Sequence, residues 1–248
     1  MKLNQIGLNI QDFHESGAED VALSLTWRHD FHMNEKDEDD SKVRDYAFEE
    51  GEYSPFLMTP FFKITGILGI GKERNEAVAL SLPFGNNGHH GVSLIGGLSF
   101  DFHDSVEIAF SAGTSHFFKR DIAGMFIPNE EHQSGIFPFK TNVSYNPGKS
   151  WYFSLGMNAY RFLEKLSFHA EYLFISHSKD SIKLLKADGA FKPAVLEDQT
   201  KWTIQAINCG FNYDLTPNFK FGVSWQAPIK QQGAYKTNTV MVTLAATF

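Results

Sequence analysis

Segments of about ten residues in which apolar and polar side chains alternate recur along this chain and limit what it can fold into. In Val21 to Trp27 the odd positions are apolar, whereas in Val92 to Phe102 and Val240 to Phe248 mainly the even positions are. Successive side chains of a strand point to opposite faces, so a period of two predicts strands with one apolar face. The pattern therefore predicts an all-β, antiparallel structure.

Ten strands are expected, in a single domain that covers 1–248. They lie near 2–10, 20–31, 59–70, 91–102, 105–118, 149–161, 165–177, 201–214, 218–228 and 238–248. Very short turns follow some strands and long polar loops follow others, the longest over 32–58, 119–150 and 177–200. This layout is typical of an up-and-down transmembrane β-barrel.

Two segments leave the strand count open. Ile136 to Tyr145 is interpreted as a hairpin within a long loop, because this keeps the three short turns at one end. Counting 76–85 and 136–145 as spanning strands gives twelve instead of ten. In 201–214 the apolar parity changes between Ile204 and Ile207, which predicts a β-bulge there.

A soluble sandwich or lipocalin-like barrel also alternates, but with its apolar face turned inward. Here the polar positions carry small residues such as Gly97, Gly156 and Ser111, as a narrow lumen would require. Aromatic residues gather near strand ends, as in the interfacial girdles of membrane barrels. No run of 18 apolar residues occurs and mean hydropathy is −0.26, so membrane-spanning helices are not expected. These features favour a barrel with lipid outside.

The net charge of −7 is concentrated in 34–56, which contains nine acidic and three basic residues. We interpret this segment as a solvated loop, with divalent cations or lipid headgroups as the alternative ligands. A basic face for nucleic acid is missing. Cys209 is the only cysteine and is expected to be a packing residue. No apolar leader region follows Met1, so if the chain is exported we expect either a mature form with an added start methionine or a missing natural N-terminus.

The segment Thr239 to Phe248 resembles the terminal strand of Gram-negative outer-membrane proteins. The resemblance implies a bacterial outer-membrane location and recognition of Phe248 by the barrel-assembly machinery. Ser16 to Trp27, Gly71 to Asn75 and Leu82 to Gly85 look like strand and loop patterns of long-chain fatty-acid transporter-type barrels. This second resemblance implies a hydrophobic substrate, although the N-terminal plug of that family is not found here.

Candidate chemical motifs are weak. His177-Ser178 invites comparison with outer-membrane phospholipase, but there the serine follows the histidine by two residues. Adjacent strand residues point to opposite faces, so this pair is interpreted as a polar loop edge. His89-His90 is interpreted as a loop rim, because no patterned cysteine or acid accompanies it. We therefore expect no enzyme, no cofactor and no metal.

Ionisable and hydroxyl residues on the polar parity of the strands are the candidate lumen lining. They are Arg28, Lys63, Glu107, Ser111, His169, Glu171 and Lys220. A paired internal network is the structural interpretation, and a pore with mixed charges is the functional one. We expect a passive outer-membrane channel for small solutes. The alternatives are a hydrophobic-substrate transporter, suggested by Phe61, Phe62, Phe117, Phe126 and Phe137, and a closed structural or adhesive barrel.

Overall fold

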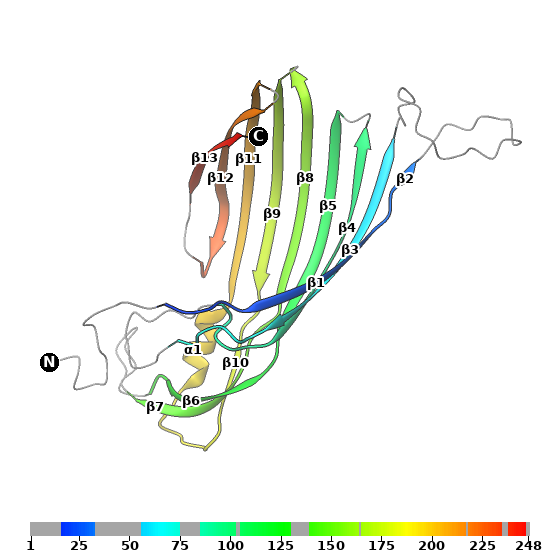
Figure 1. Ribbon diagram of the computed structural model, residues 1–248. Coiled ribbons are helices and arrows are strands. Elements are labelled where there is room, and N and C mark those ends of the chain that lie inside the picture. The colour runs from blue at the N-terminus through cyan, green and yellow to red at the C-terminus, as the bar shows by residue number, and fades with distance from the viewer. Residues whose placement is uncertain are drawn as a thin grey trace, which may run out of the picture.

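The computed structural model describes residues 16–32, 56–74, 85–102, 105–129, 139–163, 165–216, 218–234 and 238–246. It is all-β, with one large antiparallel sheet, one small antiparallel sheet and one short helix (Figure 1). The strands of the large sheet stand side by side, and the sheet curls so that β1 passes in front of it in this view.

The large sheet follows the chain order, with the order β1-β3-β4-β5-β8-β9-β11-β12-β13 and the two-residue β2 paired to β3. Its strands are β1 Val21–Arg28, β2 Phe31–His32, β3 Leu57–Leu68, β4 Gly91–Phe102, β5 Val106–Phe117, β8 Ser150–Leu163, β9 Leu166–His177, β11 Trp202–Thr216, β12 Phe219–Gln232 and β13 Thr239–Ala246.

The period-two pattern predicted this sheet well. Nine of the ten expected strands form, and only β12 departs by more than three residues, because it continues to Gln232. The expected strand 2–10 lies outside the described residues, as do 76–84 of the optional segment 76–85 and most of the acidic segment 34–56. The β4–β5, β8–β9 and β11–β12 connections are the short turns, and they lie at one end of the sheet.

The described strands do not close the sheet. Within the described part of the chain, β1 is paired only to β3 and β13 only to β12. All the pairings along the path are antiparallel, and eight of them separate the nine strands from β1 to β13. Because eight reversals restore the original direction, β1 and β13 run parallel to each other.

The long loops at the other end contain structure that the sequence did not predict. β6 Arg120–Phe126, β7 Lys140–Asn146 and β10 Ser181–Leu184 form a three-stranded sheet, and α1 Pro193–Thr200 lies beside it. The described part of 136–145 therefore belongs to a loop sheet, as interpreted, but it forms the single strand β7 between β6 and β10 rather than a hairpin of its own. No helix in the described residues is long and apolar enough to cross a membrane.

The expected bulge in 201–214 is located differently. β11 pairs with β9 in unbroken register from Trp202 to Tyr213, and the shift between Gln205 and Ala206 appears only against β12. Gln205 pairs with Lys230 and Ala206 with Pro228, so Ile229 of β12 is the extra residue. Ile204 therefore stays on the same face of β11 as Asn208. The apolar parity changes because this face, which is otherwise mainly polar, has an apolar side chain at Ile204.

Buried apolar residues gather in the loop sheet. The buried hydrophobic residues of the described chain are Ile127, Val143, Ile182 and Ala206, and the first three form one cluster under the small sheet. The large sheet instead exposes its large apolar side chains. Its hydrophobic face thus lacks a protein layer in the described residues, the reverse of a soluble sandwich.

Candidate functional site

The strand registers divide the large sheet into two continuous faces. Directly paired residues lie on the same face, so pairing can be followed from Leu25 to Ile64, Leu94 and Thr114 across four strands. The outer face contains most of the exposed large apolar residues of the sheet. They include Leu23, Leu25, Trp27, Phe62, Ile64, Leu94, Ile108, Phe110, Trp151, Leu155, Met157, Ile207, Phe211, Trp225, Val240, Val242 and Leu244.

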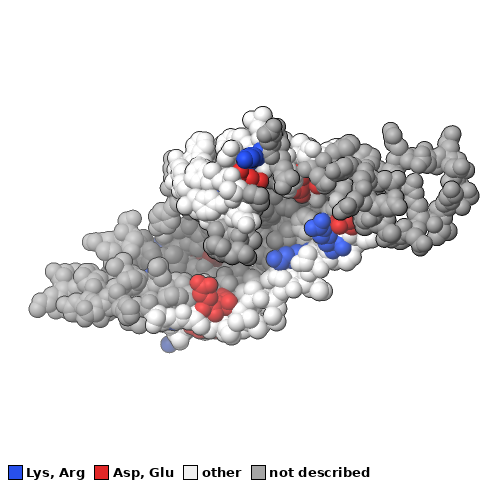
Figure 2. All heavy atoms as spheres, turned by 45° about the horizontal axis from the view of Figure 1, so that its top comes forward, with Lys and Arg blue, Asp and Glu red and all other residues white. Residues whose placement is uncertain are grey.

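The inner face contains the small and polar residues, and most of them are less exposed. In β5 the outer Ile108 and Phe110 are exposed, whereas the intervening Ala109 and Ser111 are partly buried. Ser154 on β8 is buried while the next residue, Leu155, is 48% exposed. In the view of Figure 2 most of the described residues are uncharged, and the charged side chains stand in a few small groups.

All seven candidate lumen residues lie on this inner face. Lys63 pairs with Thr26 of β1, which lies two residues before Arg28 and therefore on the same face. Ser111 pairs with the buried Ser154. Glu107 and His169 both pair with Asn158. Glu171 pairs with Asn208, and Lys220 pairs with Asp214, so these four residues lie on the same face. Sequence parity therefore placed them correctly on one face, whereas their role as a lumen lining stays a prediction.

Glu107 is the centre of a hydrogen-bonded group across β5, β8 and β9. Its carboxylate accepts hydrogen bonds from Asn158 Nδ2 at 2.9 Å and from the Tyr160 hydroxyl at 2.8 Å. Asn158 Oδ1 lies 3.2 Å from His169 Nδ1. Asn158 therefore connects an acid to an imidazole across three neighbouring strands.

Glu171 forms a second such contact, because its carboxylate accepts a hydrogen bond from Asn208 Nδ2 at 3.0 Å. The hydroxyls of Ser111 and Ser154 are 2.8 Å apart. The donors to both carboxylates, Asn158, Tyr160 and Asn208, are neutral side chains.

Two of the three cationic candidates, Arg28 and Lys220, are exposed, whereas Lys63 is half-buried in the middle of β3. Arg28 Nε is 3.1 Å from Asp30 Oδ1, and Lys220 Nζ is 3.6 Å from Asp214 Oδ1. Thr59 also donates to Asp30 at 2.8 Å. Both ion pairs are solvated, so each contributes little to stability and remains available to a passing ion.

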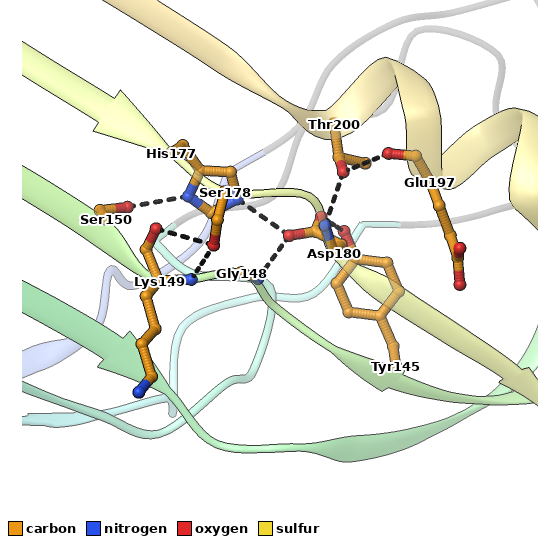
Figure 3. A network of polar contacts seen from close by, with 9 residues as sticks. All are labelled: Tyr145, Gly148, Lys149, Ser150, His177, Ser178, Asp180, Glu197 and Thr200. Atoms are coloured by element: carbon orange, nitrogen blue, oxygen red, sulfur yellow. Dashed lines mark hydrogen bonds and ion pairs between the residues drawn. The ribbon is translucent and has the colours of Figure 1, made fainter.

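A denser polar group lies at the loop end of the inner face (Figure 3). Ser150, the first residue of β8, pairs directly with His177, the last residue of β9. Ser150 Oγ lies 2.8 Å from His177 Nδ1, and His177 Nε2 lies 2.9 Å from Asp180 Oδ1. Because an ionised carboxylate only accepts, Nε2 carries the hydrogen, and Nδ1 is left to accept the hydrogen of Ser150.

Asp180 is held from several sides. Gly148 N–H donates to its Oδ1 at 2.6 Å, and the Tyr145 hydroxyl donates to its Oδ2. Burial, together with this contact to Asp180, raises the pKa of Tyr145 well above its usual range, so the phenol stays a donor. The Asp180 backbone N–H donates to Thr200 Oγ1 at 2.9 Å. The side chain of Asp180 is 6% exposed and that of His177 is 14% exposed.

Gly148 is required at its position by close packing. A Cβ there would lie 1.9 Å from the carbonyl oxygen of Ser178, so only glycine lets the two backbones approach. The rings of His177 and Trp202 stack with centroids 5.6 Å apart and an interplanar angle of 13°. Together these contacts fix the imidazole between β8, β11 and the loop that follows β9.

The helix α1 is bound to the same loop by charge. Lys179 Nζ lies 2.6 Å from Asp198 Oδ1 and 3.4 Å from Glu197 Oε2. The hydrogen bond to Asp198 is the main cause that raises the pKa of Lys179. Glu197 Oε1 also accepts the backbone N–H of Ile182 at 2.6 Å, so α1 and β10 are tied together.

Sequence reasoning missed Ser150 and Asp180 because it compared His177 only with its neighbour Ser178. Ser178 does lie apart from the imidazole: its Oγ accepts the Lys149 N–H at 2.8 Å. A regular β8–β9 hairpin would pair His177 with Tyr152. A register shift between Ala159 and Leu163 brings Ser150 opposite instead, and no sequence signal marks this shift.

The adjacent histidines are bound in separate contacts. His89 Nδ1 lies 3.0 Å from the Phe118 carbonyl, and His90 Nδ1 accepts the Gly69 N–H at 3.1 Å. The described residues contain no cluster of three or more potential metal ligands.

The comparisons with known proteins add no family to these observations. No protein-family model matches this chain, and a search of curated proteins finds no match either. Its function therefore has to be argued from its own faces and contacts.

Proposed function

We propose that the chain forms an antiparallel β-barrel in the bacterial outer membrane and acts as a passive channel for small solutes. The observation that carries the proposal is the inverted burial of the large sheet. Exposed large apolar side chains lie on one face in every described strand of the sheet except β9. Small and polar residues predominate on the opposite face, beside a few apolar ones such as Phe61, Phe117 and Ile204. Lipid is the environment in which an apolar outside is favourable.

Closure of the sheet is part of this proposal and limits the strand count. Since β1 and β13 run parallel, joining them directly would give a parallel pair in an otherwise antiparallel barrel. An odd number of additional strands between them restores full antiparallel pairing. One added strand gives ten, the number expected from the sequence. Bacterial barrels likewise have even strand numbers.

The inner face would line the path of the solute. Glu107 and Glu171 are hydrogen-bonded to neutral amides and a phenol, and within the described residues neither carboxylate forms a salt bridge. The cations Arg28 and Lys220 are each paired with an acid. Fixed carboxylates without counter-charges attract cations to a narrow pore. We therefore expect a preference for cations over anions.

Single-channel recording in a planar bilayer tests the proposal. The refolded chain should give current steps that scale with salt concentration. Glu107→Gln should move the reversal potential in a salt gradient toward anion selectivity. Asp198→Asn is a matched control, because it removes the same charge from the exposed helix α1 and should leave selectivity closer to wild type. Silence from a folded, heat-modifiable barrel would rule out the open pore.

A hydrophobic-substrate transporter is the second candidate, and two inner-face rings favour it. Phe61 and Phe117 both lie against glycines of β4, since a Cβ at Gly97 or Gly91 would be 2.4 Å or 2.5 Å from them. Phe62 belongs to the outer face, Phe126 to the loop sheet, and Phe137 lies outside the described residues. A silent barrel that copurifies with a detergent or lipid molecule inside would favour this function.

A further inference from the structure

We propose that Ser150, His177 and Asp180 form a serine-hydrolase site that cleaves small carboxylic esters. The proposal goes beyond the channel and departs from the expectation of a chain without enzymatic activity. It is carried by three side chains in one hydrogen-bonded line, which the β8–β9 register and the loop after β9 bring together (Figure 3).

The geometry matches the roles that acyl transfer needs. The nucleophile and base are within hydrogen-bond distance at 2.8 Å, and the base is oriented by a carboxylate at 2.9 Å. The roles of the two ring nitrogens are reversed relative to those in serine proteases, because here Nδ1 faces the serine and Nε2 faces the carboxylate. The chemistry is unchanged, since either nitrogen can take a proton when the other is held as N–H.

The carboxylate is more strongly anchored than a simple loop contact requires. Asp180 accepts hydrogen bonds from Gly148 and Tyr145 in addition to His177, and it is the most buried of the three side chains. The ring of Trp202 stacks on the imidazole. The base is therefore held in one tautomer and one orientation, which is the function of the third residue in a triad.

The substrate class follows from what surrounds the serine. Ser150 is partly exposed on the inner face, and its neighbours in the same register row are Ser115 and Ser93. Small side chains beside the nucleophile favour a short acyl group. The proposed channel would admit such a neutral, small ester, although the site itself requires only access to the inner face.

The reaction balances with water as the co-reactant. Ser150 Oγ forms a bond to the ester carbonyl carbon while its proton passes to His177 Nδ1. The bond from that carbon to the alcohol oxygen breaks, and the alcohol leaves with the proton from Nδ1. Water then adds to the acyl carbon, its proton passes through Nδ1 to Ser150 Oγ, and the carboxylic acid is released.

A fluorophosphonate probe followed by peptide mass spectrometry tests the nucleophile directly on the refolded full chain. We expect Ser150 to be labelled, and hydrolysis of p-nitrophenyl acetate and butyrate to fall at least about tenfold in Ser150→Ala. Ser178→Ala is the matched control, because its hydroxyl lies one residue beyond His177 and bonds Lys149 instead. It should keep both labelling and hydrolysis.

Failure of this proposal is separable from failure of the channel. An unlabelled Ser150 in a folded, heat-modifiable wild-type barrel would overturn the hydrolase site whatever the conductance. Equal hydrolysis rates in Ser150→Ala and wild type would overturn it as well. Labelled Ser150 in a preparation that conducts no current would instead support the hydrolase and remove the pore.

Discussion

At the scale of single residues, two glycines of the same sheet differ in what surrounds them. A Cβ at Gly97, on the inner face, would lie 2.4 Å from the Phe61 ring and 2.5 Å from the Phe110 carbonyl oxygen. A Cβ at Gly66, on the outer face, would meet nothing within 4 Å. Gly97→Ala should therefore lower the free energy of unfolding by about 1–3 kcal/mol.

Gly66→Ala is the control for this prediction and should be neutral or slightly stabilising, since alanine restricts the unfolded chain. Urea titration of the heat-modifiable folded fraction measures both variants. Equal midpoints would mean that the Phe61 ring moves away without cost.

Asp20 should make the stability depend on acid. Burial acts to raise the pKa of Asp20. Hydrogen bonds from the backbone N–H groups of Asn86 and Gly71 and from the Asn86 side chain, together with the coulombic effect of His90, outweigh burial and lower this pKa. A carboxylate with a lowered pKa stabilises the fold above its unfolded pKa, and this is lost as pH falls through the folded pKa.

The variant Asp20→Asn should therefore be less stable than wild type near neutral pH and should lose less stability on acidification. Urea midpoints of both proteins, near neutrality and below the usual aspartate range, measure this difference. Parallel curves would show that the Asp20 contacts make no acid-dependent contribution.

At the scale of elements, the sequence predicted the strands but not the loops. Strands can be recognised in the sequence because one face needs apolar side chains. The period of two therefore predicted the bounds of β4 and β5 to within one residue. The same parity sorted Glu107 and His169 onto the correct face. The Ser150–His177 pair depends on a register shift inside β8, which alternation does not encode. The loop sheet depends on pairing between distant segments, for which a single sequence has no local signal.

The loop sheet should unfold independently of the large sheet. Val143 is fully buried in the cluster with Ile127 and Ile182, whereas Leu185 just beyond β10 is 55% exposed. Val143→Ala should destabilise this unit by about 2 kcal/mol and speed tryptic cleavage at Lys183. Leu185→Ala should leave cleavage near the wild-type rate.

Heat-modifiable gel mobility should stay unchanged in both variants, because the large sheet forms its own pairings. Loss of that mobility in Val143→Ala would contradict the independence of the two sheets.

At the scale of the whole molecule, adjacent positions in β8 test whether the two faces meet lipid and water, as the proposed barrel requires. Leu155 is on the outer face and is 48% exposed, whereas Gly156 is on the inner face and pairs with Glu171. Leu155→Lys should cost up to about 2–4 kcal/mol of folding into bilayers, depending on its depth. Gly156→Lys should cost much less, since its Cβ has room and an acid lies nearby.

The measurement is the folded fraction after dilution from urea into lipid vesicles, read for both variants beside wild type. If both lysines are tolerated equally, the outer face does not meet the bilayer interior.

The pairing of β10 with β7 has a consequence for the order of folding. β6 and β7 are near neighbours in the chain, but Ser181 reaches Asn146 only across the whole β8–β9 segment. Closing that segment as a hairpin first converts a long loop into a short one and so lowers the entropic cost of the contact. The β8–β9 hairpin is therefore expected to form before the loop sheet gains its third strand. Amide protection at Leu185, whose N–H donates to the carbonyl oxygen of Asn142 on β7, would then report, late in refolding, that this hairpin has already closed.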